Sequence, residues 1–243
     1  MPVIDSGTLF LGESSLPGPT GSHAALAAQR DELTPIAIYM ATQINANAHG
    51  PDATRMLEMN SFSSTACISD FTALPLWRQI LGFGITPGQC IEAGISFRTA
   101  SLLAWASKVR QNGEWDHKPK IASMFHPRSP IVQHWHLYGA TLYYYDVWSN
   151  IHYGYVGRAA GFSESVLLDG AGLEQVGSDL ARLKLPSASE SVAGLRKWDA
   201  SEDRAAIEIG IRLYGQRPDS VSADLLLRSV TASILITKKA YAP

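Results

Sequence analysis

Residues 146–162 read DVWSNIHYGYVGRAAGF and combine polar side chains with closely spaced glycines. A carboxylate, an amide, an imidazole and a phenol fall within eight positions: Asp146, Asn150, His152 and Tyr153. Glycines follow at positions 154, 157 and 161, where the backbone turns or lets another group approach closely. If residues 150–161 are helical, Asn150 and these glycines share one face that allows tight packing. The stretch is therefore a candidate packing face and a candidate chemical site.

Apolar periodicity on both sides of this stretch predicts helices. Before it, apolar residues recur at three- and four-residue steps: Leu33, Ile36, Ala37, Met40 and Ile44. Thr86 and Gln89 have the spacing of a capping box, which predicts a helix that runs to about Arg110. After the stretch, Ser163 and Ser201 are placed as N-caps of two further helices.

The centre of the chain, residues 113–162, has a different character. Prolines interrupt the helical pattern, and residues 134–145 are rich in aromatic and β-favouring side chains. We expect loops here, with at most a short β-hairpin. Together the patterns predict a mainly α protein: a single compact helical domain over residues 29–243 with an irregular, aromatic-rich central region, preceded by a flexible lead-in over residues 1–28.

The N-terminal residues carry no targeting pattern. They are rich in Gly, Ser and Pro and lack the basic and apolar regions of a cleavable signal peptide, so we expect any export to use another route. A membrane-spanning helix needs about 20 continuous apolar residues, and the longest apolar runs here are far shorter. We therefore expect no membrane span. Cys67 and Cys90 either pair in an oxidising compartment or remain two buried thiols.

The charge balance is close to neutral. The chain has 20 Lys and Arg against 22 Asp and Glu, and only 17% of its residues are charged. This composition excludes a broadly basic nucleic-acid-binding protein, because the long-range attraction to phosphates is missing. A small local basic pocket is compatible with it.

A second stretch, residues 113–119, reads GEWDHKP and follows the predicted helix end. Loops on a rigid scaffold often carry functional residues. Hydrolysis by general acid and base needs one carboxyl that keeps its proton and one that keeps its charge. Asp116 and Asp146, which lie on separate segments, are the candidate pair. The alternative interpretations are a solvated turn with an exposed ion pair for this stretch, and a packed ring for His152.

Other catalytic and metal-binding patterns are missing. The sequence has no GxSxG, HExxH or GxxxxGK[ST] motif. Five of the seven histidines lie between positions 117 and 152, but His134 and His136 have no clear third ligand, and no helical HxxxH is present. We therefore predict no metal and no cofactor.

The two stretches together resemble the polymorphic toxin type 44 family, the bacterial toxin 44 domain. The resemblance, over about residues 31–217, rests on these motifs: Trp115-Asp116-x-Lys118; Asp146-x-x-x-Asn150-x-x-Tyr153-Gly154-x-x-Gly157; Gly161-Phe162 leading into Leu167-Leu168 and Ala171-Gly172 with Gln175; and Glu202-Asp203 with Ile207, Gly210 and Tyr214. Glu114 stands where the family usually has proline, so no catalytic role is carried over to it.

The resemblance implies an antibacterial toxin used between competing bacteria. It implies export by a specialised secretion system, as for a type VI cargo effector, and neutralisation in the producer by an immunity protein. The expected partners are therefore a cognate immunity protein and a component of the secretion apparatus. The family is usually described as predicted RNases, which makes RNA one candidate substrate.

Two enzyme hypotheses and one binding hypothesis follow. The favoured one is a lysozyme-like peptidoglycan glycan hydrolase acting in the periplasm, which suits the near-neutral charge and the six Trp and nine Tyr available for sugar stacking. The alternative is a metal-independent RNase in which His152 or His117 transfers protons while Lys118 and Arg158 stabilise the phosphate. The third is a non-enzymatic interaction module. The predicted catalytic residues are Asp116, Asp146, Lys118 and His152, and the predicted substrate-binding residues are Trp115, Asn150, Tyr153 and Arg158.

Overall fold

The computed structural model describes residues 31–127, 133–169 and 201–241 of the chain. The predicted lead-in over residues 1–28, and positions 171, 172 and 175 of the family resemblance, lie outside the described residues. The elements are α2 (Leu33–Ala48), α3 (Pro51–Ser61), α4 (Ser64–Thr72), α5 (Leu76–Ile80), α6 (Pro87–Val109), α7 (Lys118–Met124), β1 (Trp135–Tyr138), β2 (Thr141–Tyr144), α8 (Asp146–Ala159), α9 (Glu164–Asp169), α12 (Ser201–Gln216), α13 (Ala223–Ala232) and β3 (Lys238–Ala240). The mainly α fold class is confirmed.

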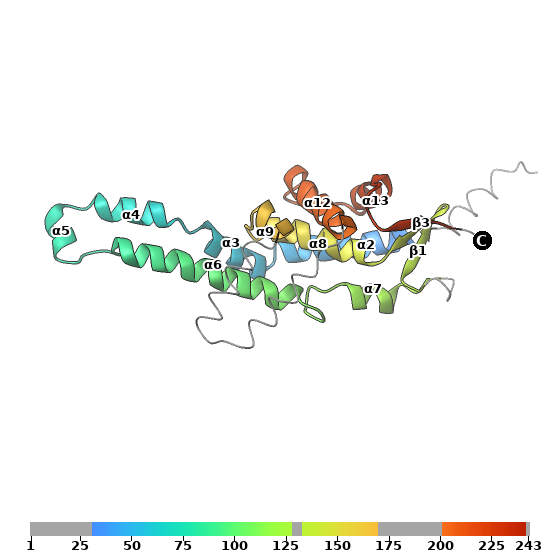
Figure 1. The fold of residues 1–243 in the computed structure, drawn as a ribbon, viewed down its shortest axis with the longest axis horizontal. Helices are drawn as coiled ribbons and strands as arrows, with labels where there is room; N and C mark the ends of the chain where they lie inside the picture. The colour runs from blue at the N-terminus through green and yellow to red at the C-terminus, as the bar shows by residue number, and fades with distance from the viewer. Residues whose placement is uncertain (1–30, 128–132, 170–200, 242–243) are drawn as a thin grey trace, which may run out of the picture.

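Helix α8 lies at the centre of the body of the molecule (Figure 1). Its residues 147–157 are all buried, because α2 and α12 pack against it. Helix α13 in turn packs against α2. The apolar face predicted for α2 is confirmed, since Leu33, Ile36 and Met40 have no exposed surface. The stretch that opened the sequence analysis thus forms the central helix of the core.

Two glycines bring α8 and α12 into backbone contact. A Cβ atom added at Gly154 would lie 2.2 Å from the carbonyl oxygen of Ile207, and one added at Gly210 would lie 2.1 Å from the carbonyl oxygen of Ile151. Only hydrogen fits at either position. Gly154 therefore confirms the close packing predicted for this face of the helix. Gly161, in contrast, lies beyond the end of α8, in a turn with φ of 85°.

The short β-hairpin predicted in the central region is formed by β1 and β2, which pair antiparallel. Strand β3 pairs antiparallel with β2 and completes a three-stranded sheet in the order β1-β2-β3. Between α12 and β3 the chain forms α13 and then returns to the sheet. The central region is also more regular than expected, because burial against α2 and α12 keeps α8 helical despite its aromatic and glycine residues.

A long helical hairpin extends away from this body (Figure 1). We call residues 62–100 the arm; it contains α4, α5 and most of α6, with α5 at its far end. The predicted capping box begins α6: Thr86 Oγ1 accepts from the Gln89 amide at 3.4 Å, and the Thr86 amide donates to Gln89 Oε1 at 2.9 Å. A disulfide joins Cys67 in α4 to Cys90 in α6, with a Cα–Cα distance of 5.8 Å. Of the two alternatives, a disulfide or two buried thiols, the structure contains the disulfide.

Candidate functional site

The N-terminal ends of α8 and α12 meet beside the start of α7. Asp146 is the first residue of α8, and Asn150 follows one turn later on the same face. The Asn150 side-chain amide donates to Oδ1 of Asp203, in the first turn of α12, at 2.6 Å. Lys118, at the start of α7, is close enough to Asp146 to act on its charge. We call Lys118, Asp146, Asn150 and Asp203 the carboxylate cluster.

Asp146 is the residue whose acid–base chemistry is most altered in this cluster. Burial raises the pKa of its carboxyl from 3.8 to about 6, the nearby Lys118 ammonium opposes the rise, and the Asp203 carboxylate adds to it. Its Oδ1 is buried without a hydrogen-bond partner among the described residues. Lys118, Asp146 and Asp203 are nevertheless partly exposed, so the cluster reaches solvent. A carboxyl with a pKa near 6 can carry a proton to a substrate near neutral pH.

Asp116 holds the loop that leads into α7. Its Oδ2 accepts from the Asn112 amide at 2.9 Å, and its Oδ1 accepts from the Lys118 amide at 3.1 Å. Asn112 has a positive φ of 59°, so the carboxylate stabilises a turn that a non-glycine residue seldom adopts. The pKa of Tyr145 is raised, chiefly by burial, and the charges of Tyr144, Asp146 and Asp116 add to the rise.

Two histidines are buried beneath the cluster. The rings of His117 and His152 contact each other with centroids 4.3 Å apart. The Tyr39 hydroxyl lies 3.1 Å from His117 Nδ1, and Asn47 Nδ2 lies 2.9 Å from His152 Nε2. Burial lowers the pKa of His117 to about 3 and that of His152 well below its ordinary value. Both rings are therefore neutral at pH 7.

The predicted aromatic ligands lie in the core. Trp115 and Tyr153 are each 4% exposed and make edge contacts with Trp105, at centroid distances of 5.7 and 5.1 Å. Burial raises the pKa of Tyr153 to about 12. In this arrangement the two rings support α8 from inside. Tyr144 and Tyr145, which precede Asp146 in the chain, are partly exposed, and Asp146 adds to the rise that burial causes in their pKa values.

Arg158 lies at the opposite end of α8 from the cluster. Twelve residues separate it from Asp146, which is about 18 Å along a helix axis. Its Nη1 donates to the carbonyl oxygen of Phe162 at 2.6 Å and so closes the turn after the helix. The structure therefore does not bring Arg158 together with Lys118.

Sequence reasoning did not select Asp203 as a site residue. Glu202-Asp203 is one of the motifs of the family resemblance, but the helix dipole also favours a carboxylate in the first turn of a helix, so no chemical role was assigned to Asp203. Tyr39 and Asn47, on α2, were also missed, because their contacts to His117 and His152 cross 78 and 105 positions of the chain. The i, i+4 spacing of Asp146 and Asn150 was the one local indication that α8 presents polar groups on one face.

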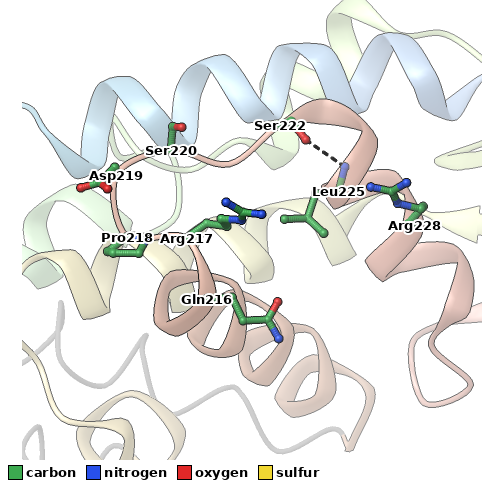
Figure 2. Close-up of a pocket in the computed structure, with 8 residues that line it drawn as sticks. All are labelled: Gln216, Arg217, Pro218, Asp219, Ser220, Ser222, Leu225 and Arg228. Atoms are coloured by element: carbon green, nitrogen blue, oxygen red, sulfur yellow. Dashed lines mark hydrogen bonds between the residues drawn. The ribbon is translucent and has the colours of Figure 1, made fainter.

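A separate pocket of about 490 Å³ lies at the C-terminal end of α12 (Figure 2). Its lining residues are Gln216, Arg217, Pro218, Asp219, Ser220, Ser222, Leu225 and Arg228. Gln216 and Asp203 are thirteen residues apart on α12, about 20 Å along the axis. The pocket is therefore distinct from the carboxylate cluster.

The findings on metal ligands and membrane-spanning helices concern the described ranges 31–127, 133–169 and 201–241. No group of three or more His, Cys, Asp or Glu side chains there is arranged to hold a metal ion. Within those same ranges, no helix has the length and apolar character needed to cross a membrane.

One comparison with known proteins finds a similarity that covers the cluster. No curated protein and no solved structure matches the chain. Residues 104–216 match the model of the family described as bacterial toxin 44, a range that begins near the end of α6 and contains every member of the carboxylate cluster. The match agrees with the resemblance drawn from the sequence motifs. Residues 104–216, slightly less than half of the chain, are therefore similar to the bacterial toxin 44 domain.

Proposed function

We propose that the protein is a secreted antibacterial toxin that hydrolyses the glycan strands of peptidoglycan. Its toxin character is supported by the family match. The observation that carries the hydrolase is the pKa of about 6 at Asp146, next to a second carboxylate, Asp203. Hydrolysis of a glycosidic bond needs one carboxyl that donates a proton and another that accepts one.

In this mechanism Asp146 donates its proton to the glycosidic oxygen while the bond from that oxygen to the anomeric carbon breaks. Asp203, oriented by Asn150, takes a proton from the water that attacks the anomeric carbon. The products are two shortened glycan strands. A proton then passes from Asp203 through solvent to Asp146, and the site returns to its starting state.

The neighbouring residues fit supporting roles. The Lys118 ammonium offsets part of the negative charge and keeps the pKa of Asp146 from rising further. Asp116 acts as a positioning residue, because its hydrogen bonds hold the loop that presents Lys118. Tyr144 and Tyr145 offer partly exposed rings on which a sugar can stack.

The buried residues predicted from the sequence support the site from below. We assign His152, Trp115 and Tyr153 to holding α8 in place, since each is at most 4% exposed. Arg158 is assigned to the C-terminal turn of α8 through its bond to Phe162.

The periplasm is the proposed site of action. The Cys67–Cys90 disulfide suits an oxidising compartment, where such bonds form and persist. A toxin of this kind needs an immunity protein in the producing cell and a secretion apparatus that delivers it, as for a type VI cargo effector. Both partners are part of the proposal.

The ribonuclease alternative has less support from the geometry. Its two histidines are buried and have lowered pKa values, and its two cations lie at opposite ends of α8. General acid–base transfer favours groups that titrate near the working pH and reach the substrate.

Expression in one bacterial host, with and without a periplasmic export signal, tests the proposal. We expect rounding and lysis only when the protein is exported, and no toxicity from an exported Asp146→Asn variant. If the protein without the export signal killed the cells and their RNA was lost, the protein would be a ribonuclease and not a glycan hydrolase. Absence of toxicity in both compartments, with the protein folded, would favour the interaction module.

A further inference from the structure

The far end of the arm is an apolar surface that none of the described residues of the body covers. Leu76 and Ile80 in α5 are 71% and 74% exposed. The other large apolar side chains exposed at this end are Trp77, Leu81, Phe83 and Ile85. Scattered exposed apolar residues are ordinary, but a contiguous group at one end of a molecule marks an interaction site. We call residues 71–91 the tip.

Charge is almost absent from the tip. Arg78 is its one ionisable side chain besides the disulfide cysteine, and its guanidinium lies 5.1 Å from the centre of the Trp77 ring. Exposed carboxylates begin on both sides of the tip, at Asp70 and Glu92. The apolar surface therefore ends at a charged boundary on both helices of the arm. An aromatic and aliphatic surface with one long basic side chain is typical of a membrane interface.

Close contacts and a disulfide join α4 to α6 below the tip. Small residues fill the contact between α4 and α6: Ser64 Oγ donates to the Cys90 carbonyl oxygen at 3.0 Å, and a Cβ atom at Gly94 would lie 2.2 Å from Ser64 Oγ. Large residues on α6, Ile91 and Ile95, point outward and are exposed. The Phe62 and Phe97 rings, 5.1 Å apart, add a contact at the base of the arm, so the two legs of the hairpin are held together below the tip.

We propose that the arm is a lipid-binding element and that its tip inserts into the boundary between headgroups and acyl chains of a bilayer. The tip is the end of a protruding hairpin, a shape that lipids can surround from several sides. Glu92 lies five residues into α6, about 8 Å from the start of that helix, which matches the depth of interfacial insertion. The arm ends before the bacterial toxin 44 match begins, so this role does not depend on the bond that the domain cleaves.

Co-sedimentation of the full chain with vesicles of phosphatidylethanolamine and phosphatidylglycerol tests the proposal. We expect the wild type to bind, and a Leu76→Ser/Ile80→Ser variant to lose at least about tenfold in vesicle affinity, since it removes most of the buried apolar area at α5. Binding should persist at high salt, because it is apolar rather than electrostatic. The matched control is Ile234→Ser/Leu235→Ser, which changes two exposed apolar residues outside the arm and should bind like the wild type.

Two further measurements keep the outcome decisive. Circular dichroism checks that each variant is folded, and brominated lipids should quench fluorescence from Trp77 but not from a Trp77→Phe variant. Wild-type protein that stays in solution, or a tip variant that binds equally well, would overturn the proposal. The proposal would also be overturned if the wild type did not bind vesicles and formed a dimer in light scattering that became monomeric in the tip variant, because the tip would then be a contact between two copies.

Hydrolysis of purified peptidoglycan should be unaffected in the tip variant. Failure of the lipid-binding proposal can therefore be distinguished from failure of the proposed enzyme.

Discussion

The side chain of Asn150 donates to Asp203 Oδ1 at 2.6 Å and ties the first turn of α12 to α8, one turn beyond Asp146. This bond orients the second carboxylate of the proposed acid–base pair. The amide carbonyl of Asn150 is buried and finds no partner among the described residues, so the side chain serves mainly as a donor to Asp203. The bond therefore connects the packing of the two helices to the chemistry proposed for their ends.

Replacing Asn150 by Asp tests this connection. The variant loses the donor and places a third carboxyl beside Asp146, and like charge raises the pKa of Asp146 further above 6. We expect a lower maximal rate and a pH–rate profile whose falling limb moves to higher pH. The profile is measured on purified peptidoglycan, with Asn150→Ser as the variant that removes the amide without adding charge. If the falling limb of the Asn150→Asp profile did not move, residue 150 would have no influence on the pKa of Asp146.

Gly154→Ala should destabilise the protein by disrupting the contact of α8 with α12. Its new methyl group would meet the Ile207 carbonyl oxygen at 2.2 Å, so the helices must move apart. Overpacking of this kind costs about 1–3 kcal/mol of unfolding free energy, and more where backbone must shift. Chemical denaturation measures the loss.

Gly215→Ala is the control for this substitution, because it changes a glycine of α12 that has no atom within 4 Å of the added Cβ. Alanine is the better helix former, so we expect no loss and a gain of up to about 1 kcal/mol. Equal stability of the two variants would contradict the close helix contact.

The raised pKa of Asp146 predicts how stability depends on pH. The folded state binds the proton more tightly than the unfolded state, so the stabilisation is complete below pH 3.8 and is lost as pH rises through about 6. Relative to Asp146→Asn, the wild type should lose up to about 3 kcal/mol of unfolding free energy between pH 4 and pH 8. Denaturation curves for both proteins at each pH give the difference. If the two proteins differed in unfolding free energy by the same amount at every pH, burial would not raise the pKa of Asp146.

The buried histidines make an opposite prediction. Burial lowers the pKa of His117 to about 3, so the neutral ring stabilises the fold above pH 6.5 and this stabilisation is lost as pH falls from 6.5 towards 3. We expect the NMR signals of the His117 ring to remain those of a neutral imidazole from pH 8 to about pH 5. If the His117 ring instead titrated near pH 6.5 in the folded protein, His117 would again be a candidate proton donor.

Much of the fold could be predicted from local patterns. The periodicity of Leu33, Ile36 and Met40 predicted α2, and the capping box at Thr86 and Gln89 predicted the start of α6. These features act within one or two helical turns, so sequence spacing is enough to find them. The start of α12 was predicted to within one residue, since Ser201, expected as the N-cap, is the first residue of the helix.

The rest depends on contacts between distant parts of the chain. Asp203 becomes a site residue only because Gly154 and Gly210 let α12 lie against α8. Tyr153 is polar in the sequence and buried in the structure, since α8 is covered on nearly all sides. The arm was not anticipated, because its apolar residues have the composition of a core and only the three-dimensional arrangement leaves them exposed.

The release of reducing ends from purified peptidoglycan by the wild type and Asp146→Asn tests the central claim most directly. Removing a general acid lowers the rate by about 100-fold or more. We therefore predict a loss of that size in a variant whose folding is intact, and a wild-type rate that falls as pH rises above about 6. A variant that keeps the wild-type rate, or a wild type that releases no reducing ends at any pH between 5 and 8, would contradict the account.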